Sequence, residues 1–297
     1  MSPMTEPGSR FDVAAPESGE PFVPYVEAGV PDSVYHADKR TLSSSEARRV
    51  LESPSRYRWE KDHERPYNAA FEVGHAAHTM LLGAGSDWVI VEEASWRSKA
   101  AREARDEALR DGKNPVLRGD FDVVKAMADR MLEHPLCGRL FTRDDAYPEL
   151  SMYWNGDGLE GPVPCRARPD LTVGEGVPEV LVDYKTTADA SPDGFARSVA
   201  RYGYHMQQEW YRDACEVLYG ARPGFVFVVQ EKAPPYDVGV YTLDDTAAEL
   251  GRRMNSVARG VWEWCVRHGS WPSPFKPEPV TVSLPAWEES RLREEYL

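Results

Sequence analysis

Apolar residues recur at helical spacing through the first half of the chain. Ser43 and Glu46 form a capping box (S-x-x-E) ahead of an apolar periodic run, and this helix is expected to stop at Ser53-Pro54. The same spacing predicts further helices over residues 69–82, 95–110 and 120–134. We therefore expect a helical first half.

The second half changes to strand patterns. The apolar run EVLVDY at 179–184 indicates a central strand that is covered on both faces, and residues 238–243 indicate an edge strand. Other strands are predicted over 150–154, 163–168 and 225–230, and helices over 195–219 and 246–268. The pattern predicts an α/β protein with a central mixed sheet that is flanked by helices.

The composition of the chain and the positions of its proline and glycine residues predict three segments. Residues 1–40 are rich in Pro, Gly, Ser and Glu and predict a flexible tail. Residues 41–270 show no clean internal boundary and predict one domain, a size that suits a single core. Residues 271–297 predict an extended proline-rich arm that ends in a short helix near 288–296.

Composition and charge limit the classes of protein to which this chain could belong. Hydrophobic residues make up 41% of the 297 residues, which is enough to bury a core and excludes wholesale disorder. No apolar run approaches the roughly 20 residues that a membrane helix needs, and the first residues lack the features of a secretory signal, so we expect a cytoplasmic protein without membrane contact. The net charge is 35 − 49 = −14, so nucleic-acid binding would need local basic groups. Arg48, Arg49 and Arg56 form such a group, although a solvated helix face with mixed ion pairs is equally consistent.

The four cysteines do not predict a metal or redox centre. Cys137, Cys165, Cys215 and Cys265 are 28, 50 and 50 residues apart, with no C-x-x-C pair. This spacing argues against a zinc knuckle, an iron–sulfur cluster and a disulfide framework. Reduced, buried thiols are expected.

One group of acidic residues and a lysine is a candidate reactive site. Asp183 and Lys185 are two apart at the end of the apolar run, so their side chains share one side of a strand. Asp170 lies 13 residues upstream, which suits an antiparallel hairpin with its loop near residues 174–176 and would place the two carboxylates together. Glu149 precedes them at the start of another strand. A D-x-K pair by itself is also compatible with an exposed ion pair at a strand end.

Clustered carboxylates repel one another and take up protons unless a cation lies between them. Oxygen ligands in this number favour Mg²⁺, with Mn²⁺ as an alternative. Lys185 would position or deprotonate a water molecule, or neutralise charge that develops in the reaction. Such an assembly is suited to phosphodiester cleavage.

The order of these motifs resembles the PD-(D/E)xK nuclease superfamily, and most closely the exonuclease VIII (RecE) type of phage and prophage exodeoxyribonuclease, which is related to the RecB nuclease domain and more distantly to lambda exonuclease. The resemblance implies a restriction-endonuclease-like core with a helical N-terminal half. The motifs that carry it are Glu149, Arg168-Pro169-Asp170, Asp183-Tyr184-Lys185-Thr186-Thr187 and the Q-x-x-x-Y element Gln207 to Tyr211.

The resemblance also implies roles for named residues. A His from an upstream helix would join Asp170 and Asp183 in holding the metal, and Gly74-x-x-x-His78 matches that element, with His75 as the alternative. Gln207 and Tyr211 are four apart and share a helix face with access to the site or the DNA backbone. The catalytic set is then Asp170, Asp183, Lys185, Glu149, Gln207 and Tyr211. The DNA-binding set is Arg48, Arg49, Arg56, Arg166, Arg168 and Thr186, and Arg166 and Arg168 would equally suit buried pairs with carboxylates.

The function that this resemblance implies is a metal-dependent exonuclease on double-stranded DNA ends. It would resect the 5′ strand for phage-type recombination and hand the overhang to a RecT-like single-strand annealing protein. Family members form homo-oligomeric rings around DNA, which would reconcile an acidic exterior with a basic lumen. Three alternatives stay open: a structure- or site-specific endonuclease, a catalytically silent DNA-binding protein, and a hydrolase of small phosphoesters.

Overall fold

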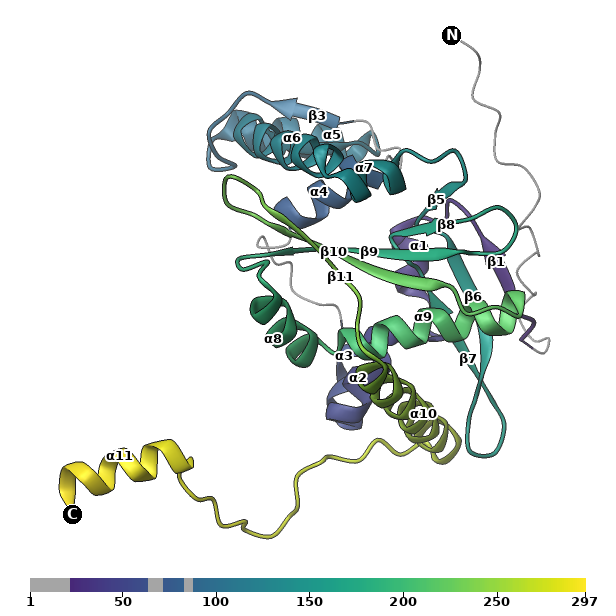
Figure 1. The fold of residues 1–297 in the computed structure, drawn as a ribbon, viewed down its shortest axis with the longest axis vertical. Coiled ribbons are helices and arrows are strands. Elements are labelled where there is room, and N and C mark those ends of the chain that lie inside the picture. Colours follow the sequence, from purple (N-terminus) through teal and green to yellow (C-terminus); the bar gives the residue numbers. More distant parts are fainter. Residues whose placement is uncertain (1–21, 64–71, 83–87) are drawn as a thin grey trace.

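The computed structural model describes residues 22–63, 72–82 and 88–297, and it contains two main β-sheets where the sequence predicted one (Figure 1). The five-stranded sheet has the order β11-β10-β9-β8-β5 and is mixed, because β9 and β10 are parallel while the other neighbours are antiparallel. Its strands are β5 (Ala146–Pro148), β8 (Leu171–Val173), β9 (Val180–Thr187), β10 (Gly224–Glu231) and β11 (Val238–Tyr241). The expected central strand and edge strand are thus confirmed as β9 and β11.

The four-stranded sheet has the order β1-β6-β7-β2, with β2 parallel to β7 and the other pairs antiparallel. Its strands are β1 (Tyr25–Glu27), β2 (Leu42–Ser43), β6 (Ser151–Asp157) and β7 (Pro162–Ala167). A separate pair, β3 (Trp88–Val91) with β4 (Asn114–Leu117), belongs to the helical region.

The predicted helices of the first half are present with ends shifted by a few residues. They are α2 (Ser44–Glu52), α4 (Glu72–Leu82), α5 (Lys99–Arg110) and α6 (Arg118–Glu133), with α7 (Pro135–Phe141) following. The capping box is confirmed, since the Glu46 amide donates to Ser43 Oγ and the Ser43 amide donates to Glu46 Oε2. Ser53 ends α2 as predicted and also caps a further helix, α3 (Pro54–Asp62), by accepting from the Arg56 amide.

The long helix predicted over 195–219 is two helices, α8 (Pro192–Tyr202) and α9 (Tyr204–Tyr219). Gly203 separates them with φ +70°, a left-handed conformation that glycine adopts at little cost. A β-carbon at this position would lie 2.8 Å from Cδ of Arg48, so the bend also needs the missing side chain. The last helix of the body, α10 (Asp245–His268), agrees with the prediction.

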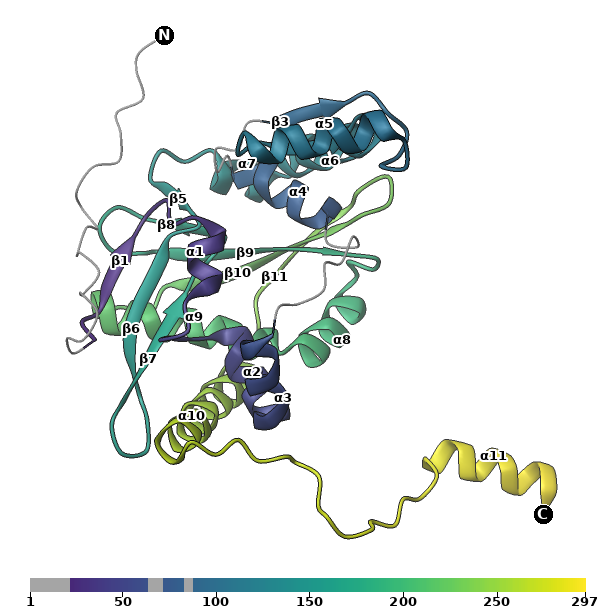
Figure 2. The same cartoon turned by 180° about the vertical axis from the view of Figure 1, so that it is seen from behind.

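Helices cover both faces of the five-stranded sheet (Figures 1 and 2). On one face, side chains of α4, α6 and α7 pack with alternate residues of β8, β9 and β10, among them Val182, Tyr184 and Val228. On the other face, Leu181 and Phe227 join a core formed by α8 and α9. Helix α9 also packs against β6 and β7, so it lies between the two sheets and can reach groups on both.

The expected tail needs correction. Residues 1–21 lie outside the described residues, but residues 22–40 include β1, which pairs with β6, and α1 (Asp32–Ala37). Tyr35 of α1 is buried and stacks with the guanidinium of Arg168, and Asp32 pairs with that guanidinium at 2.8 Å. Aromatic burial and this ion pair hold the segment on the four-stranded sheet, against the flexibility that its composition predicted.

The predicted C-terminal arm leaves the body after α10 and ends in α11 (Ala286–Tyr296) (Figure 1). Its apolar side chains are exposed, with Val282 and Trp287 more than 70% accessible. Among the described helices, none combines the length and apolar composition that crossing a bilayer requires.

Candidate functional site

Strands β8 and β9 bring the predicted acids together. Their antiparallel register pairs Leu171 with Val182, so one step further places Asp170 opposite Asp183. The connecting loop contains Gly174 (φ +129°) and Gly176 (φ +77°), conformations that L-residues rarely adopt. The hairpin inferred from the 13-residue separation is therefore confirmed.

The edge of β9 is unpaired beside Asp183 because β8 begins only at Leu171. The Tyr184 amide donates to Asp170 Oδ2 at 2.6 Å, and Nε2 of His78 on α4 lies 2.9 Å from the Tyr184 carbonyl oxygen. Two side chains thus satisfy the backbone groups that a longer neighbouring strand would have paired. His78 therefore lies at the site, whereas the side chain of its alternative, His75, is outside the described part of the structure.

The tautomer of His78 follows from this contact. A carbonyl oxygen can only accept, so Nε2 carries a proton and donates it to that oxygen. Nδ1 faces Asp170 Oδ1 at 3.6 Å, which is too long for a hydrogen bond. In the neutral form of the ring, Nδ1 would offer a lone pair to the same space that Asp170 Oδ1 faces.

Asp170 is electrostatically unfavourable in this position. Burial, reinforced by the nearby carboxylate of Asp183, raises its pKa to about 6 against the opposing effects of His78 and Lys185. The local negative charge is only partly compensated by the protein. Such an arrangement is common at functional sites, although structural networks can also produce it.

Asp183 is the most enclosed group of the site, with 1% exposure. Its Oδ1 accepts from Gln207 Nε2 at 2.8 Å, and its Oδ2 forms an ion pair with Lys185 Nζ. Gln207 also lies 3.1 Å from the Tyr211 hydroxyl, so the two ends of the Q-x-x-x-Y element touch each other and the acid, as their helical spacing predicted. Burial by itself would lower the pKa of Lys185, but Asp183 and Asp170 raise it above its ordinary value. Lys185 is accordingly protonated at neutral pH.

One neighbour of Lys185 was missed by the sequence reasoning. The ring centroid of Tyr204, the first residue of α9, lies 4.8 Å from Lys185 Nζ. Tyr204, Gln207 and Tyr211 occupy positions i, i+3 and i+7, so all three share one helix face. That spacing was the signal that could have found it.

Two predicted site residues take other positions. The Glu149 amide donates to the Asp170 carbonyl oxygen at 3.0 Å, so its main chain lies beside the site, with φ at an unusual +49°. No hydrogen bond or ion pair of the Glu149 side chain is found among the described residues. Thr186 alternates with Lys185 along β9, so its side chain faces the side that carries Tyr184 and not the carboxylates.

Arg166 and Arg168 are structural residues, which corrects their assignment to DNA. Arg166 is 2% exposed, pairs with Glu46 at 3.1 Å and donates to Thr41. Arg168 pairs with Asp32 and donates to Ser151 Oγ at 2.9 Å. Both guanidiniums are paired with protein carboxylates, although Nε of Arg166 is buried without a hydrogen-bond partner. The buried-pair alternative left open by the sequence is therefore the one that the structure shows.

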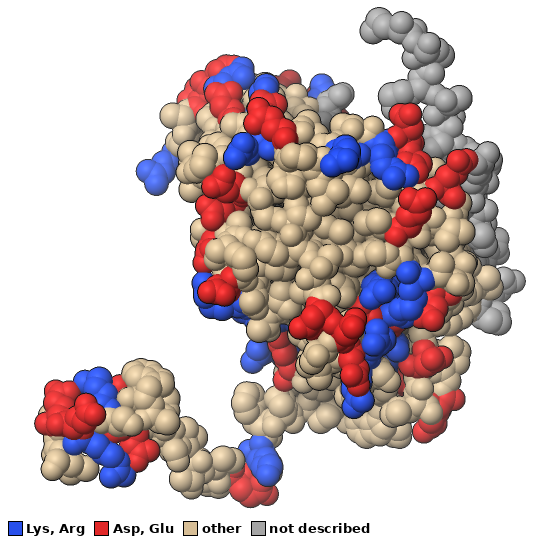
Figure 3. Space-filling model, in the orientation of Figure 1, with Lys and Arg blue, Asp and Glu red and all other residues tan. Residues whose placement is uncertain are grey.

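The three arginines predicted to bind DNA on α2 and α3 differ in whether they form ion pairs. Arg48 pairs with Glu52 at 2.6 Å and Arg49 with Glu60 at 3.3 Å, as expected of a mixed ion-pair surface. Arg56 is exposed, and among the described residues its guanidinium has no ion-pair partner. On the face shown in Figure 3, basic and acidic side chains lie next to one another around a broad uncharged centre.

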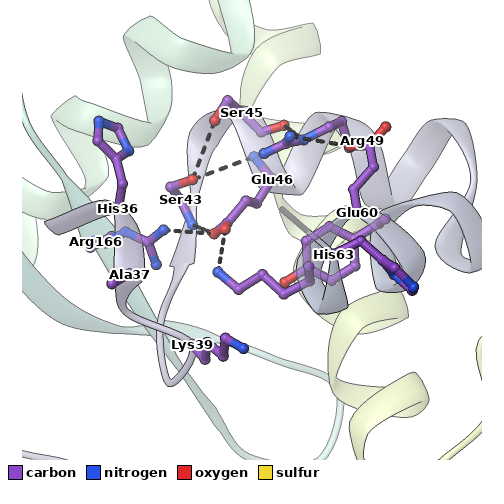
Figure 4. Close-up of a pocket in the computed structure, with 12 residues that line it drawn as sticks. His36, Ala37, Lys39, Ser43, Ser45, Glu46, Arg49, Glu60, His63 and Arg166 are labelled. Carbon is purple, nitrogen blue, oxygen red and sulfur yellow. Dashed lines mark hydrogen bonds and ion pairs between the residues drawn. The ribbon is translucent and has the colours of Figure 1, made fainter. Parts of the chain in front are cut away.

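A cavity of about 500 Å³ lies at the start of α2 (Figure 4). Glu46 is at its centre, where Oε1 contacts Lys61 Nζ at 2.5 Å and Oε2 contacts Arg166. Burial would raise the pKa of Glu46, but Arg166 and Lys61 lower it below its ordinary value. Its lining includes neither Asp170 nor Asp183.

A mixed sheet whose edge carries Asp170, Asp183 and Lys185, with a Gln-x-x-x-Tyr helix beside it, defines a restriction-endonuclease-like core. Residues 43–274 match the family described as PDDEXK-like domain of unknown function (DUF3799), and the chain belongs to this family. The superfamily inferred from the motifs is thereby confirmed.

A solved structure shows the same fold at low sequence identity. A protein from Eubacterium rectale, described as "Putative exonuclease", is 15% identical with a TM-score of 0.55, and the similarity covers 85% of this chain and 96% of that one. A second structure, of SSO0001, is 13% identical over 80% of this chain and 89% of that one, with a TM-score of 0.33. No curated protein matches the sequence.

Proposed function

We propose that this protein is a metal-dependent exonuclease that degrades one strand of duplex DNA from its ends, by resemblance the 5′ strand. The observation that carries the proposal is the convergence of Asp170, Asp183 and Lys185 beside the start of β8, with His78 and Gln207 in contact with the same groups. An excess of carboxylate that faces a common space suits a phosphate substrate only if a cation binds there.

The residues present fit a divalent cation. As the structure stands, the described residues contain no group of three or more His, Cys, Asp or Glu side chains arranged to hold a metal ion. Mg²⁺, however, commonly uses one or two carboxylates together with water and substrate phosphate. Asp170 Oδ1 and His78 Nδ1 face each other without a hydrogen bond, and buried Asp183 Oδ2 makes no well-directed hydrogen bond to the protein. Asp170, Asp183 and His78 would hold the ion, which when bound would polarise the phosphate and lower the pKa of a coordinated water.

The protein groups supply charge and orientation. Protonated Lys185 is suited to neutralise charge that develops on a phosphate oxygen, and this favours the electrostatic role over deprotonation of water. Gln207 fixes one oxygen of Asp183 and leaves the other toward Lys185. Tyr211 accepts from the Gln207 amide and holds it in place.

The preference for exonuclease over endonuclease comes from the RecE-type motifs and from the described activity of the Eubacterium rectale neighbour. By the same resemblance we propose a homo-oligomeric ring on DNA and transfer of the overhang to a RecT-like annealing protein. Arg56 on α3 is best placed to contact DNA, since it is exposed and has no ion-pair partner within the part of the chain that the structure describes. An endonuclease with the same site is the second candidate.

The test is cleavage of linear duplex DNA labelled at either the 5′ or the 3′ end, and of closed circular DNA, with Mg²⁺ or with chelator. We expect Mg²⁺-dependent loss of the 5′ label from linear DNA only. Lys185→Ala and Asp183→Ala should each lower the rate by about 10²–10³, whereas Lys125→Ala, in an exposed ion pair, should not. Cleavage of the circle would favour the endonuclease. Binding of DNA without any cleavage would indicate a silent binding protein.

A further inference from the structure

We propose that Tyr204 is a positioning residue that holds the ammonium of Lys185 in place for the reaction, an inference that rests on the proposed nuclease function. Lys185 Nζ lies 4.8 Å from the Tyr204 ring centroid, within the range of a cation–π contact. Its other close contact is the ion pair with Asp183. The ammonium is therefore held between a carboxylate and an aromatic face.

The local fold fixes the ring in this position. Gly203 ends α8 in a left-handed conformation, so α9 starts at Tyr204 in a new direction. The ring packs against Phe195 (6.1 Å between centroids) and Phe227 (5.8 Å), which also contact each other, and Phe227 is the β10 residue in register with Asp183. A ring held by two other aromatic rings loses little further freedom when the ammonium rests on it.

The chemical consequence concerns which hydrogen bonds the ammonium can make. A lysine side chain has a flexible stem of four carbons, so its ammonium can reach several acceptors unless it is restrained. The aromatic face attracts the charge but accepts no strong N–H hydrogen bond, so donors that do not point at Asp183 stay free for an oxygen of the substrate. Helix α9 thus orients both members of the D-x-K pair, with Gln207 on Asp183 and Tyr204 on Lys185.

Four variants separate this role from simple packing. Tyr204→Leu removes the ring and is expected to lower kcat for DNA cleavage about 10-fold, with KM nearly unchanged because Tyr204 would not touch the substrate. Tyr204→Phe keeps the ring and should retain activity close to that of the wild type. Tyr241→Leu removes a ring of the same aromatic cluster that stacks on Phe195 (4.8 Å between centroids) and, among the described residues, has no ring or cation–π contact with Tyr204 or Lys185. This variant should lower stability while the folded fraction keeps its kcat. In Lys185→Met, the further change Tyr204→Leu should cost no additional activity.

A readout without cleavage keeps the two proposals apart. Urea unfolding of the chelated protein gives the unfolding equilibrium constant of Tyr204→Leu, of Lys185→Met and of the double variant. The effect of the double variant should differ from the product of the two single effects by about 3- to 10-fold, which reports their contact directly. An inactive wild type would refute the nuclease and leave this coupling to be measured. Multiplicative effects, a wild-type kcat in Tyr204→Leu, or an equal loss of kcat in Tyr241→Leu would each overturn the positioning role.

Discussion

Two buried clusters of this protein use the same residue types and have opposite charge balance. At the start of α2, Glu46 forms ion pairs with Arg166 and Lys61 and accepts a hydrogen bond from the Ser43 amide, and its pKa is lowered. At the edge of β9, Asp170 and Asp183 share Lys185, and burial raises the pKa of Asp170 to about 6.

The difference teaches how to separate a structural ion pair from a reactive one. A carboxylate that the protein saturates gains nothing from a further cation, and its cluster serves to join elements. A carboxylate that the protein leaves in excess has capacity for a cation or a proton from outside. Here the α2 cluster joins α2, α3 and β7, whereas the β9 cluster lies at an open strand edge.

The largest effect is expected from breaking the saturated cluster. Glu46→Ala leaves the guanidinium of Arg166 buried without its carboxylate, so the free energy of unfolding should fall by about 3–5 kcal/mol. Urea denaturation measures this loss, and Glu52→Ala, which removes only an exposed i,i+4 pair with Arg48, should cost about 0.5 kcal/mol or less. A similar small cost for Glu46→Ala would show that the two clusters do not differ as described.

The opposite response is expected at β9. Asp170→Asn should lower the cleavage rate by about 10²–10³ and, without metal, raise the free energy of unfolding at pH 8 by about 1–3 kcal/mol. The native pKa lies above the ordinary value, so the wild type loses stability as pH rises from about 4 to about 6, and the variant does not. Urea denaturation at pH 8 and near pH 4 measures the gain, which should shrink at the lower pH. Asp129→Asn, in an exposed pair, is the control, and the comparison fails if Asp170→Asn destabilises the chelated protein at pH 8.

The smallest effect sharpens the contrast between free and saturated cations. Arg56→Ala should weaken DNA binding evenly across sequences and reduce the slope of log K against log salt by about 1. Fluorescence anisotropy at several salt concentrations measures the slope. Arg58→Ala provides the matched change, because Arg58 lies on the same helix but already pairs with Asp62 at 2.9 Å. Equal slopes for wild type and Arg56→Ala would remove Arg56 from the DNA-binding surface.

Local patterns in the sequence determined much of the fold and the centre of the site. The capping box at Ser43 and Glu46 and the run that became β9 depend on neighbours within a few residues, so spacing revealed them. The pairing of Asp170 with Asp183 followed from strand alternation and a glycine-containing loop. The contact of Gln207 with Tyr211 followed from helical periodicity.

Tertiary structure decided what depends on partners distant in sequence. Whether Arg166 meets phosphate or a carboxylate was set by Glu46, 120 residues away, because only packing determines which charges are removed from water together. The ring of Tyr204 lies 4.8 Å from Lys185, 19 residues earlier in the chain, because α9 starts at Tyr204 after the break at Gly203. The sequence thus determined which groups could be reactive, and the fold determined which of them the protein itself neutralises.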